Sequence, residues 1–412
     1  MPRTDWPAVT RRVSVTRRTW ISGVLTGMGG LLAGCAGGGG MFNSGQPPMQ
    51  SSQLPPPDAA QSAEGAIGMG AVKVGLILPL SATGNAGLVA LSMKNAAELA
   101  LAEFHSDNIQ LLVKDDGGTP AGAQMAAQQA LDEGAELILG PLFAQSVSAV
   151  GQIARPRGIP VIAFSTDANV ASRGVYLLSF LPESDVDRIV DYAVANGKNS
   201  FAALLPDSAY GAVAEAAFKQ AIGRKNARLV ALERYAPDKL KMQDPVKIIA
   251  QSASRADAIF IPDGADVVPL VAQSLAANGV TKRIQYLGSG LWGDDSRIFG
   301  EPLLHGAWYP AANTEGFRNF AGRYKARYGQ DPIRTATLSY DAVALAAALV
   351  KTQGPQRFSE EVLTSPSGFN GVDGIFRFKT DGTNTRGLAV LRVTPNGGQV
   401  VSPAPRAFGS AT

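Results

Sequence analysis

Short β-branched or leucine-rich runs alternate with alanine-rich stretches of helical length from residue 71 onward, and this alternation restricts the possible folds more than any other feature of the chain. Strands that alternate with helices of this length are typical of a parallel sheet with crossover helices. The run at 75–78, Gly-Leu-Ile-Leu, has no polar position, which indicates burial on both faces of a sheet. The sequence therefore predicts an α/β fold with doubly wound parallel sheets.

The expected strands are 72–78, 109–114, 136–139, 161–164, 201–205, 228–233, 258–261 and 285–287. The expected helices between them are 88–104, 121–133, 145–157, 186–195, 211–222, 245–254 and 266–277.

The C-terminal part departs from this alternation. An apolar helix expected at 335–351 is followed by two strand-like runs, 374–378 and 388–393. Asp381-Gly382 lies between the runs, and an Asp-Gly pair between two strands indicates a turn, so we expect a terminal hairpin. The helix could seek a membrane, but its apolar stretch at 336–350 is too short to span one, and we expect a buried core helix.

The N-terminal residues have the layout of a bacterial lipoprotein signal. Four arginines between residues 11 and 18 precede a mostly apolar, glycine-rich stretch that ends in Leu32-Ala33-Gly34-Cys35, and Cys35 is the only cysteine. Positive charge stays in the cytoplasm, a short apolar segment enters the translocase, and small residues fit the peptidase. We expect removal of residues 1–34 and lipidation of Cys35, the alternative being a buried free thiol in an unprocessed chain. Residues 16–21 also resemble a twin-arginine export signal, so the export route stays open.

Processing would change the charge of the chain. Residues 1–34 carry five arginines and one aspartate, a net +4, so the formal charge falls from +3 to −1. A nearly neutral chain lacks the basic patch that nucleic-acid binding needs, and we exclude nucleic acid as a partner. No cysteine other than Cys35 is available for a disulfide, so stability must come from apolar burial. The 378 residues that remain of 412 predict about two domains.

Residues 35–70 form the expected tether between the lipid and the globular part. They are rich in Gly, Pro, Ser and Gln and show no apolar period, which is typical of a flexible, disordered linker. About 35 residues of random coil reach roughly 30 Å root-mean-square. The tether would therefore hold the globular part away from the membrane surface, and the membrane would be contacted through the lipid anchor only.

Several segments resemble the type I periplasmic binding proteins, particularly the leucine/isoleucine/valine-binding branch. They are VKVGLILPLS at 72–81, MKNAAELA at 93–100, VKDDGG at 113–118, ILGPL at 138–142, IPVIAFST at 159–166 and DSAYG at 207–211. The resemblance runs from about residue 72 to about residue 395. It implies two doubly wound parallel-sheet lobes joined by a three-crossing hinge, which close on a ligand.

Mapped onto this chain, the resemblance implies a first lobe of 72–184 plus 311–365 and a second lobe of 185–310 plus 366–399. The hinge would lie near 181–182, 309–310 and 366–367. Residues 400–412 would form a tail.

Ligands of open α/β sheets bind beyond the carboxyl ends of the strands. The residues that follow the expected strands and form the candidate ligand site are Ser81, Gln145, Ser146, Ser165, Thr166, Tyr210, Asp263 and Trp292. Hydroxyls and free N–H groups at helix starts, as at Ser146, Ser165 and Thr166, either receive an anion or cap the helix. Tyr210 and Trp292 on strand-end loops either contact a ligand or partner, or pack.

The resemblance also implies how an amino acid would be bound. In the family's pocket, small and hydroxyl residues of the first lobe bind the carboxylate, and Thr166 matches one such position. An aromatic residue and an acid of the second lobe bind the ammonium, but this chain has Gly264 and Gly290 at those positions. An unpaired buried ammonium would cost several kcal/mol, so Asp263 or Asp167 would have to replace the acid.

Two functions follow from the resemblance. The first is a lipid-anchored periplasmic solute-binding protein of the leucine-binding type, which serves amino-acid-type ABC uptake and is recognised by an ABC permease. The alternative is a penicillin-binding protein activator, an outer-membrane lipoprotein that regulates peptidoglycan synthases by direct contact. Ala36 rather than aspartate follows Cys35, which favours the outer over the inner membrane.

We expect no enzyme, no cofactor and no metal site. His105 and His305 lie 200 residues apart in unlike contexts, and the one cysteine, Cys35, is the expected lipidation site. The chain contains no Gly-x-Ser-x-Gly elbow and no glycine-rich phosphate loop.

Overall fold

The computed structural model describes residues 65–408, apart from residues 106, 237, 239, 281–283, 294 and 313. The expected signal, Cys35 and the tether up to residue 64 lie outside the described residues. Within the described part of the chain, no helix is both long enough and apolar enough to cross a membrane. The apolar helix expected at 335–351 is present as α10 (Ala336–Thr352), and most of its side chains are buried.

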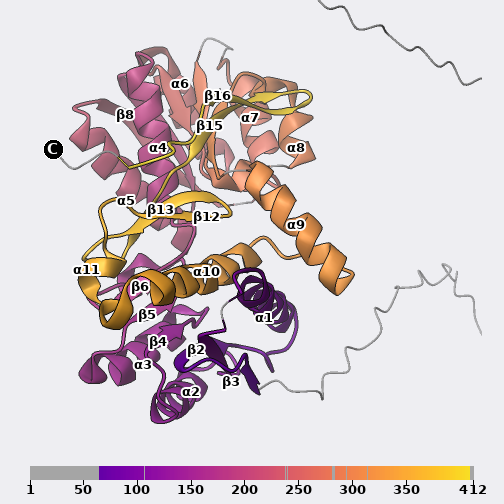
Figure 1. The fold of residues 1–412 in the computed structure, drawn as a ribbon. Coiled ribbons are helices and arrows are strands. Elements are labelled where there is room, and N and C mark those ends of the chain that lie inside the picture. The colour runs from indigo at the N-terminus through magenta and orange to yellow at the C-terminus, as the bar shows by residue number, and fades with distance from the viewer. Residues whose placement is uncertain are drawn as a thin grey trace, which may run out of the picture. The chain divides into compact units, whose positions relative to one another are not determined.

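The first sheet contains six strands in the order β1-β3-β2-β4-β5-β6 (Figure 1). They are β1 (Gly65–Ile67), β2 (Val72–Leu78), β3 (Ile109–Asp115), β4 (Leu137–Leu139), β5 (Val161–Ala163) and β6 (Val175–Leu177). All neighbours pair in parallel except β1 with β3. The end of the expected tether is thus ordered, because Gly65–Ile67 finds backbone partners along the free edge of β3.

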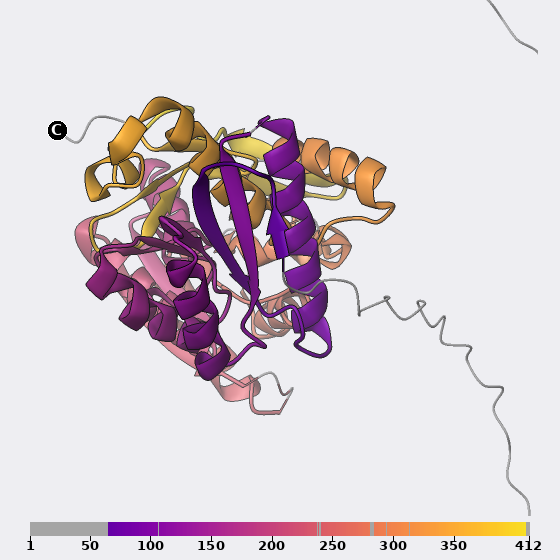
Figure 2. The same ribbon diagram turned by 60° about the horizontal axis from the view of Figure 1, so that its bottom comes forward.

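Helices cover both faces of this sheet. One face packs against α1 (Asn85–Glu103) and α10, and the other against α2 (Pro120–Asp132) and α3 (Ala144–Ala154). In β2, Leu76 and Leu78 belong to the α1 side and Ile77 to the α2 and α3 side, as the strand period of two requires. Figure 2 shows the indigo strands between α1 and the purple helices. The predicted burial on both faces is confirmed.

The second sheet has seven strands in the order β16-β15-β11-β10-β9-β7-β8. They are β7 (Ser200–Pro206), β8 (Arg228–Tyr235), β9 (Ala258–Phe260), β10 (Gln285–Leu287), β11 (Trp308–Ala311), β15 (Ala389–Thr394) and β16 (Gly397–Ser402). The helices that accompany it are α4 (Pro182–Ala195), α5 (Ala209–Arg224), α6 (Gln243–Ser252), α7 (Val268–Ala277) and α8 (Ser296–Phe299). Strands β7 to β11 are parallel, whereas β15 and β16 are antiparallel additions at one edge.

The predicted terminal hairpin is wrong. The run at 374–378 forms β13 (Gly374–Phe378), which pairs with β12 (Phe369–Gly371) and β14 (Asn384–Arg386) in a third, three-stranded sheet. The run at 388–393 instead forms β15, between β11 and β16. Asp381-Gly382 does make the turn after β13, where Asp381 accepts hydrogen bonds from the N–H and hydroxyl of Thr383 at 2.8 and 2.6 Å.

This third sheet belongs with the first lobe. Phe376 and Phe378 pack in the cluster that contains β2 and α10, and the Asn384 amide donates to the Leu177 and Ser179 carbonyls, both at 2.8 Å. The chain therefore passes to the second lobe at 387–388, between β14 and β15, and the crossing expected near 366–367 is wrong. The apolar side chains of β13 account for the difference, since they complete the first core.

The other two crossings lie between β6 and α4 and between β11 and α9 (Thr314–Tyr328). Helix α9 returns the chain to the first lobe, where Phe320 and Tyr324 are fully buried. We call the first and third sheets with their helices the first lobe, and the second sheet with its helices the second lobe.

Asp257, directly before β9, forms hydrogen bonds with the start of β7. Its Oδ2 accepts hydrogen bonds from the Asn199 N–H, the Ser200 N–H and the Ser200 hydroxyl, at 2.9, 2.9 and 2.7 Å. Partial burial opposes ionisation, but these hydrogen bonds outweigh it and lower the pKa of the carboxyl. We expect Asp257→Ala to cost about 2 kcal/mol in urea unfolding at neutral pH, because three donors lose a charged acceptor. A lowered pKa stabilises the fold above the unfolded value, so the difference from wild type should shrink only as the pH falls below about 4.

Candidate functional site

The carboxyl ends of the first-lobe strands carry two adjacent acids with different partners. Asp115 accepts hydrogen bonds from the N–H groups of Ser81, at 3.2 Å, and of Gly117, at 2.9 Å. Burial works to raise the pKa of Asp115, but a hydrogen bond from the Ser81 hydroxyl and these backbone bonds outweigh it and lower the pKa. Ser81 is exposed beyond the end of β2, with its hydroxyl directed at Asp115.

Asp116 and Ser146 form a buried polar pair below this edge. Asp116 Oδ1 accepts a hydrogen bond from Gly118 N–H at 2.8 Å, whereas Oδ2 has no hydrogen-bond partner. The Ser146 hydroxyl lies beside Asp116, is fully buried and also makes no well-formed hydrogen bond. Burial raises the pKa of Asp116. The Ser146 hydroxyl opposes this shift as a hydrogen-bond donor to the carboxyl, so these two side chains are polar partners of each other.

The remaining first-lobe candidates differ in accessibility. Ser165 is buried, and its hydroxyl accepts a hydrogen bond from Asp167 N–H at 3.1 Å, which is a turn-capping role. Thr166 and Gln145 are exposed. Of this group, Ser81, Gln145 and Thr166 present accessible polar groups, and Ser165 holds the loop that carries Thr166.

The second-lobe candidates Asp263 and Trp292 are engaged within the protein. The Tyr235 phenol donates to Asp263 Oδ2 at 2.6 Å, and Gly264 N–H donates to Oδ1 at 2.7 Å. Trp292 is fully buried and packs against Tyr309, with ring centroids 6.3 Å apart, although its indole N–H lacks a partner. Both residues are therefore engaged in contacts within the protein, which leaves few of their polar atoms for hydrogen bonds to a ligand.

Tyr210 lies in a polar group that the sequence did not identify. It is half-buried in the first turn of α5, close to the Asp185 carboxylate and the Ser289 hydroxyl. Burial and the neighbouring charge of Asp185 raise the pKa of Tyr210, so it stays a phenol. Ser289 is fully buried and its hydroxyl forms no hydrogen bond of good geometry.

Asp185 takes the space that Gly290 leaves open. It lies in the first turn of α4, and its Oδ2 accepts a hydrogen bond from Gly290 N–H at 2.8 Å. A Cβ at position 290 would lie only 2.7 Å from that oxygen, so only glycine allows this approach. Burial raises the pKa of Asp185 to about 7, against the hydrogen bond from Gly290 and the charge of Arg386. A carboxylate from α4 thus lies against the loop after β10, at the position where the family resemblance implied an acid.

The same turn of α4 faces the first lobe. Glu183, two residues before Asp185, has a raised pKa because it is buried, and the negative charge of Asp167 adds to the shift. Asp167 follows Thr166 in the first lobe, so the strand-end groups of the two lobes lie within electrostatic range of each other. In the part of the chain that the structure describes, no lysine or arginine makes an ion pair with Glu183 or Asp185.

We call Ser81, Ser146, Thr166, Asp185, Tyr210 and Ser289 together the strand-end site. Between the lobes, Arg386 of β14 is almost fully buried, donates from Nε to the Ser179 carbonyl at 2.8 Å and lies over the Phe180 ring at 4.5 Å.

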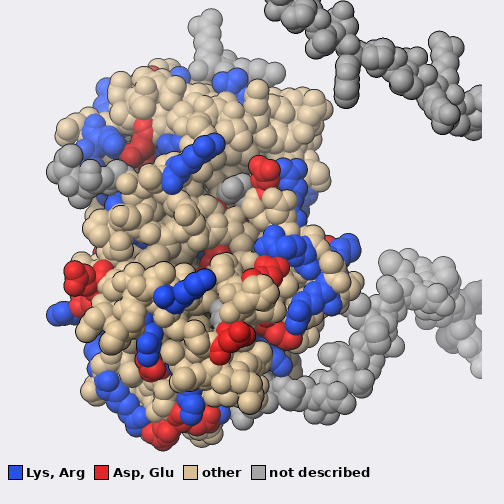
Figure 3. Space-filling view, in the orientation of Figure 1, with Lys and Arg blue, Asp and Glu red and all other residues tan. Residues whose placement is uncertain are grey.

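The described residues include no group of three metal-binding side chains. Figure 3 shows acidic and basic side chains interspersed over the face in view, without a large patch of one sign.

Comparisons with known proteins agree with this arrangement. A family model described as "Periplasmic binding protein" matches residues 71–399. The uncharacterized protein RP748 of Rickettsia prowazekii is 23% identical over 181 residues, which cover 42% of this chain and 48% of the relative. The chain thus matches about half the length of this curated relative.

Solved structures share the fold. A protein from Rhodospirillum rubrum, assigned to a branched-chain amino acid ABC transporter, has a TM-score of 0.71 at 22% identity and covers 80% of this chain and 99% of its own. A solute-binding protein of an ABC transporter from Rhodopseudomonas palustris BisB5, in complex with 3,4-dihydroxybenzoic acid, has a TM-score of 0.56 at 20% identity, with coverages of 83% and 98%. Because these sequence identities are low, the similarity to the solved structures is evidence for a shared fold alone.

Proposed function

The chain belongs to the periplasmic binding protein family, and on that premise we propose that it is a non-catalytic solute-binding protein of the leucine-binding type. Its ligand is an amino acid or a derivative that carries both a carboxylate and an ammonium group. It serves as the binding component of an amino-acid-type ABC uptake system and is recognised by the permease.

One observation carries this proposal, the carboxylate of Asp185 at the strand ends of the second lobe. It is oriented by Gly290 N–H and lies beside Tyr210 and Ser289, and no described cation pairs with it. Burial raises its pKa to about 7, against the hydrogen bond from Gly290 and the charge of Arg386, which forms no ion pair with it. An ammonium group placed beside Asp185 would supply a positive charge in direct contact, and the ligand would be held by the attraction.

The first lobe supports a carboxylate at the opposite side of the same ligand. Ser81 and Thr166 are exposed at the strand ends, and Thr166 precedes the short helical turn at 168–170, whose backbone N–H groups begin there. Such groups suit an anion. The related structure with bound 3,4-dihydroxybenzoic acid contains a ligand with a carboxylate, which agrees with an anionic group on the solute.

The anchor is part of the proposal. Cys35, after a run of small residues and an apolar stretch, would carry the lipid, and residues up to 64 would link it to β1. Ala36 rather than aspartate after the cysteine favours the outer membrane, a location that fits the alternative, a penicillin-binding protein activator, better than it fits a receptor for a permease. Radiolabelled palmitate should enter the wild-type chain and be lost in Cys35→Ser.

The proposal is tested by thermal unfolding of the mature chain, residues 35–412, with a panel of amino acids, small peptides and peptidoglycan fragments. A shorter chain that starts at residue 71 is unsuitable because it lacks β1. A ligand at about a hundred times its dissociation constant should stabilise the chain by about 2.7 kcal/mol, a clear shift in Tm. Thr166→Ala should weaken the shift for a carboxylate ligand, whereas Thr364→Ala, which lies directly after α11 (Glu360–Leu363) and is not part of the strand-end site, should not.

Absence of a shift with every member of the panel would contradict the proposal. The penicillin-binding protein activator, which needs no small ligand, would then take its place. Its own test is recovery of a peptidoglycan synthase in a pull-down with the mature chain, with binding that survives Thr166→Ala.

A further inference from the structure

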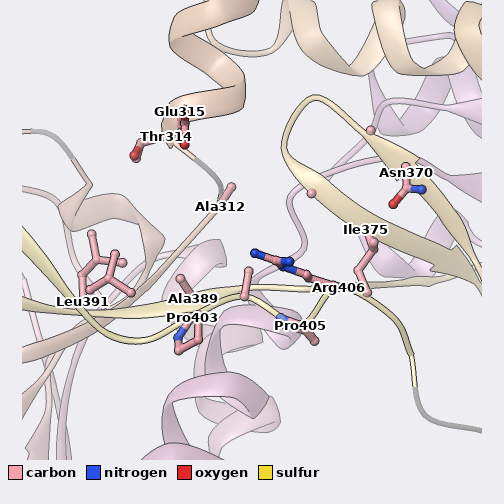
Figure 4. Close-up of a pocket in the computed structure, with 14 residues that line it drawn as sticks. Ala312, Thr314, Glu315, Asn370, Ile375, Ala389, Leu391, Pro403, Pro405 and Arg406 are labelled. Carbon is pink, nitrogen blue, oxygen red and sulfur yellow. The ribbon is translucent and has the colours of Figure 1, made fainter. Parts of the chain in front are cut away.

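A cavity lies at the hinge, on residues that take no part in the strand-end site. Its volume is about 620 Å³, within the usual range for small-molecule sites. Its walls come from the start of α9, from β12 and β13, from β15 and β16, and from residues 403–406 after β16 (Figure 4). The cavity is therefore built from both lobes.

The segment 403–408, here called the hinge strap, connects the lobes a fourth time. It leaves β16 in the second lobe, where Ala404 packs against the second-lobe core. It then runs over the third sheet, which belongs to the first lobe, and the Arg377 guanidinium lies 4.6 Å from the centre of the Phe408 ring. One side of the cavity is thus closed by chain that spans the hinge.

Two glycines allow the strap to approach the backbone beneath it. A Cβ at Gly387, at the crossing after β14, would lie 3.1 Å from Pro405 Cγ. A Cβ at Gly368, where φ is +69°, would lie 2.8 Å from the Phe408 ring. The strap is seated on specific positions of the hinge, so its path and the cavity wall it forms are defined by packing.

The lining combines one unpaired cation with an apolar surface. Arg406 is exposed, its guanidinium extends into the cavity, and it forms no ion pair among the described residues (Figure 4). Ile375, Leu391 and Val400 supply apolar area, and Val400 is 58% exposed. Glu315, on the α9 wall, already has an interaction of its own. A planar guanidinium beside apolar walls matches a carboxylate attached to an apolar body.

We propose that this hinge cavity is a second ligand site, which binds a small apolar carboxylate through Arg406. The carboxylate pairs with the guanidinium, and the apolar part lies against Ile375, Leu391 and Val400. Because the walls belong to both lobes and to the strap, a bound molecule also affects the hinge. Ligands at the two sites must then change each other's affinity by the same factor.

The test uses isothermal titration of the mature chain with hexanoate, with hexanamide as the uncharged control. Wild type should bind hexanoate at least tenfold more tightly than hexanamide, since a hydrogen bond to a charged group contributes roughly that much. Arg406→Gln should lose about tenfold for hexanoate and leave hexanamide unchanged. Arg392→Gln, an exposed arginine of β15 that does not line the cavity, should bind as wild type.

Truncation after Ser402 removes the strap and should abolish hexanoate binding, while circular dichroism checks that the variants fold. Arg406→Lys keeps the charge without the planar fork and should retain intermediate affinity, which separates a charge effect from loss of fold. Equal hexanoate affinity in wild type and Arg406→Gln would overturn the proposal, as would no binding by wild type. Loss of hexanoate binding in Asp185→Asn alone would place the ligand at the strand-end site and would also overturn it. If no amino acid in the thermal-shift panel changed the Tm, that outcome would contradict ligand binding at the strand-end site. It would not affect the measurement of hexanoate binding at the hinge cavity.

Discussion

Asp185→Asn is expected to weaken binding of an amino-acid ligand by about 100-fold, because removal of one partner of a desolvated charge pair typically costs about 2–5 kcal/mol. Asparagine keeps an oxygen that can accept the hydrogen bond from Gly290 N–H, so the loop after β10 should keep its place. The change therefore removes charge without removing shape. Isothermal titration at about pH 8, where the wild-type carboxyl is ionised, measures the difference.

The pH dependence gives the prediction a second readout. The pKa of Asp185 is about 7, and an ammonium ligand binds the ionised form. The affinity of wild type should therefore rise as the pH increases from about 6 to about 8, whereas that of Asp185→Asn should stay level. The stability of the unliganded chain depends on pH in the opposite direction. A carboxyl whose pKa is raised by folding stabilises the fold below its unfolded pKa and loses that contribution as the pH rises to about 7.

Asp187→Asn is the matched control for Asp185→Asn. Asp187 lies on the same helix, its pKa is also raised by burial, and it pairs with Arg224 away from Gly290. The control should leave the ligand affinity and its pH profile unchanged. Equal affinity in wild type and Asp185→Asn would show that the ligand lacks a cation at this place, and the proposed amino-acid ligand would have to be given up.

The strands and helices that the sequence identified are those with a clear apolar period. The bounds of β2 and β10 agree with the predicted 72–78 and 285–287, since each is a mostly apolar run that lies inside its sheet. Helix α9 was not predicted. Its buried residues Phe320 and Tyr324 lie in a segment rich in arginine and lysine, and Arg323 and Arg327 form ion pairs with Glu103 and Glu98 of α1. This polar composition hid the apolar face of the helix from a reading of the sequence.

The third sheet could not be read from local pattern for a different reason. β14 is the polar tripeptide Asn384-Thr385-Arg386, which has no strand period. It is held by contacts far apart in sequence, from Asn384 and Arg386 to the carbonyls at the end of β6. The more apolar run at β15 looked like the natural partner of β13, but it completes the second sheet instead.

The rule that ligands bind beyond the ends of strands selected residues of both lobes but missed the acid. It selected Ser81, Thr166 and Tyr210, which follow strands, but not Asp185, which follows a crossing and lies in the first turn of a helix. Gly290 looked like a missing acid in the sequence. Only the folded chain shows that a glycine there makes room for a carboxylate from 105 residues earlier. The acidic residues after Pro182 were the available signal, and they also suit an ordinary helix start.

Phe218→Ala is expected to destabilise the second lobe by about 3–5 kcal/mol, the usual cost of truncating a buried phenylalanine. Phe218 lies on α5 and is fully buried. Its ring stacks on Phe260 of β9 at 4.6 Å and meets Phe201 of β7 edge-on at 6.0 Å. The cavity left by truncation would lie between α5 and the two central strands, where backbone elements cannot move together without breaking the sheet.

The measurement is urea unfolding followed by intrinsic fluorescence, with Phe104→Ala as the control. Phe104 is 48% exposed at the end of α1, so its removal should cost less than about 1 kcal/mol. Tyr210 opens the helix that Phe218 anchors, so Phe218→Ala should also weaken the amino-acid ligand even where the lobe remains folded. If Phe218→Ala cost no more than Phe104→Ala, the packing between α5 and the second sheet would not support Tyr210, and the contribution of that sheet to the strand-end site would need another explanation.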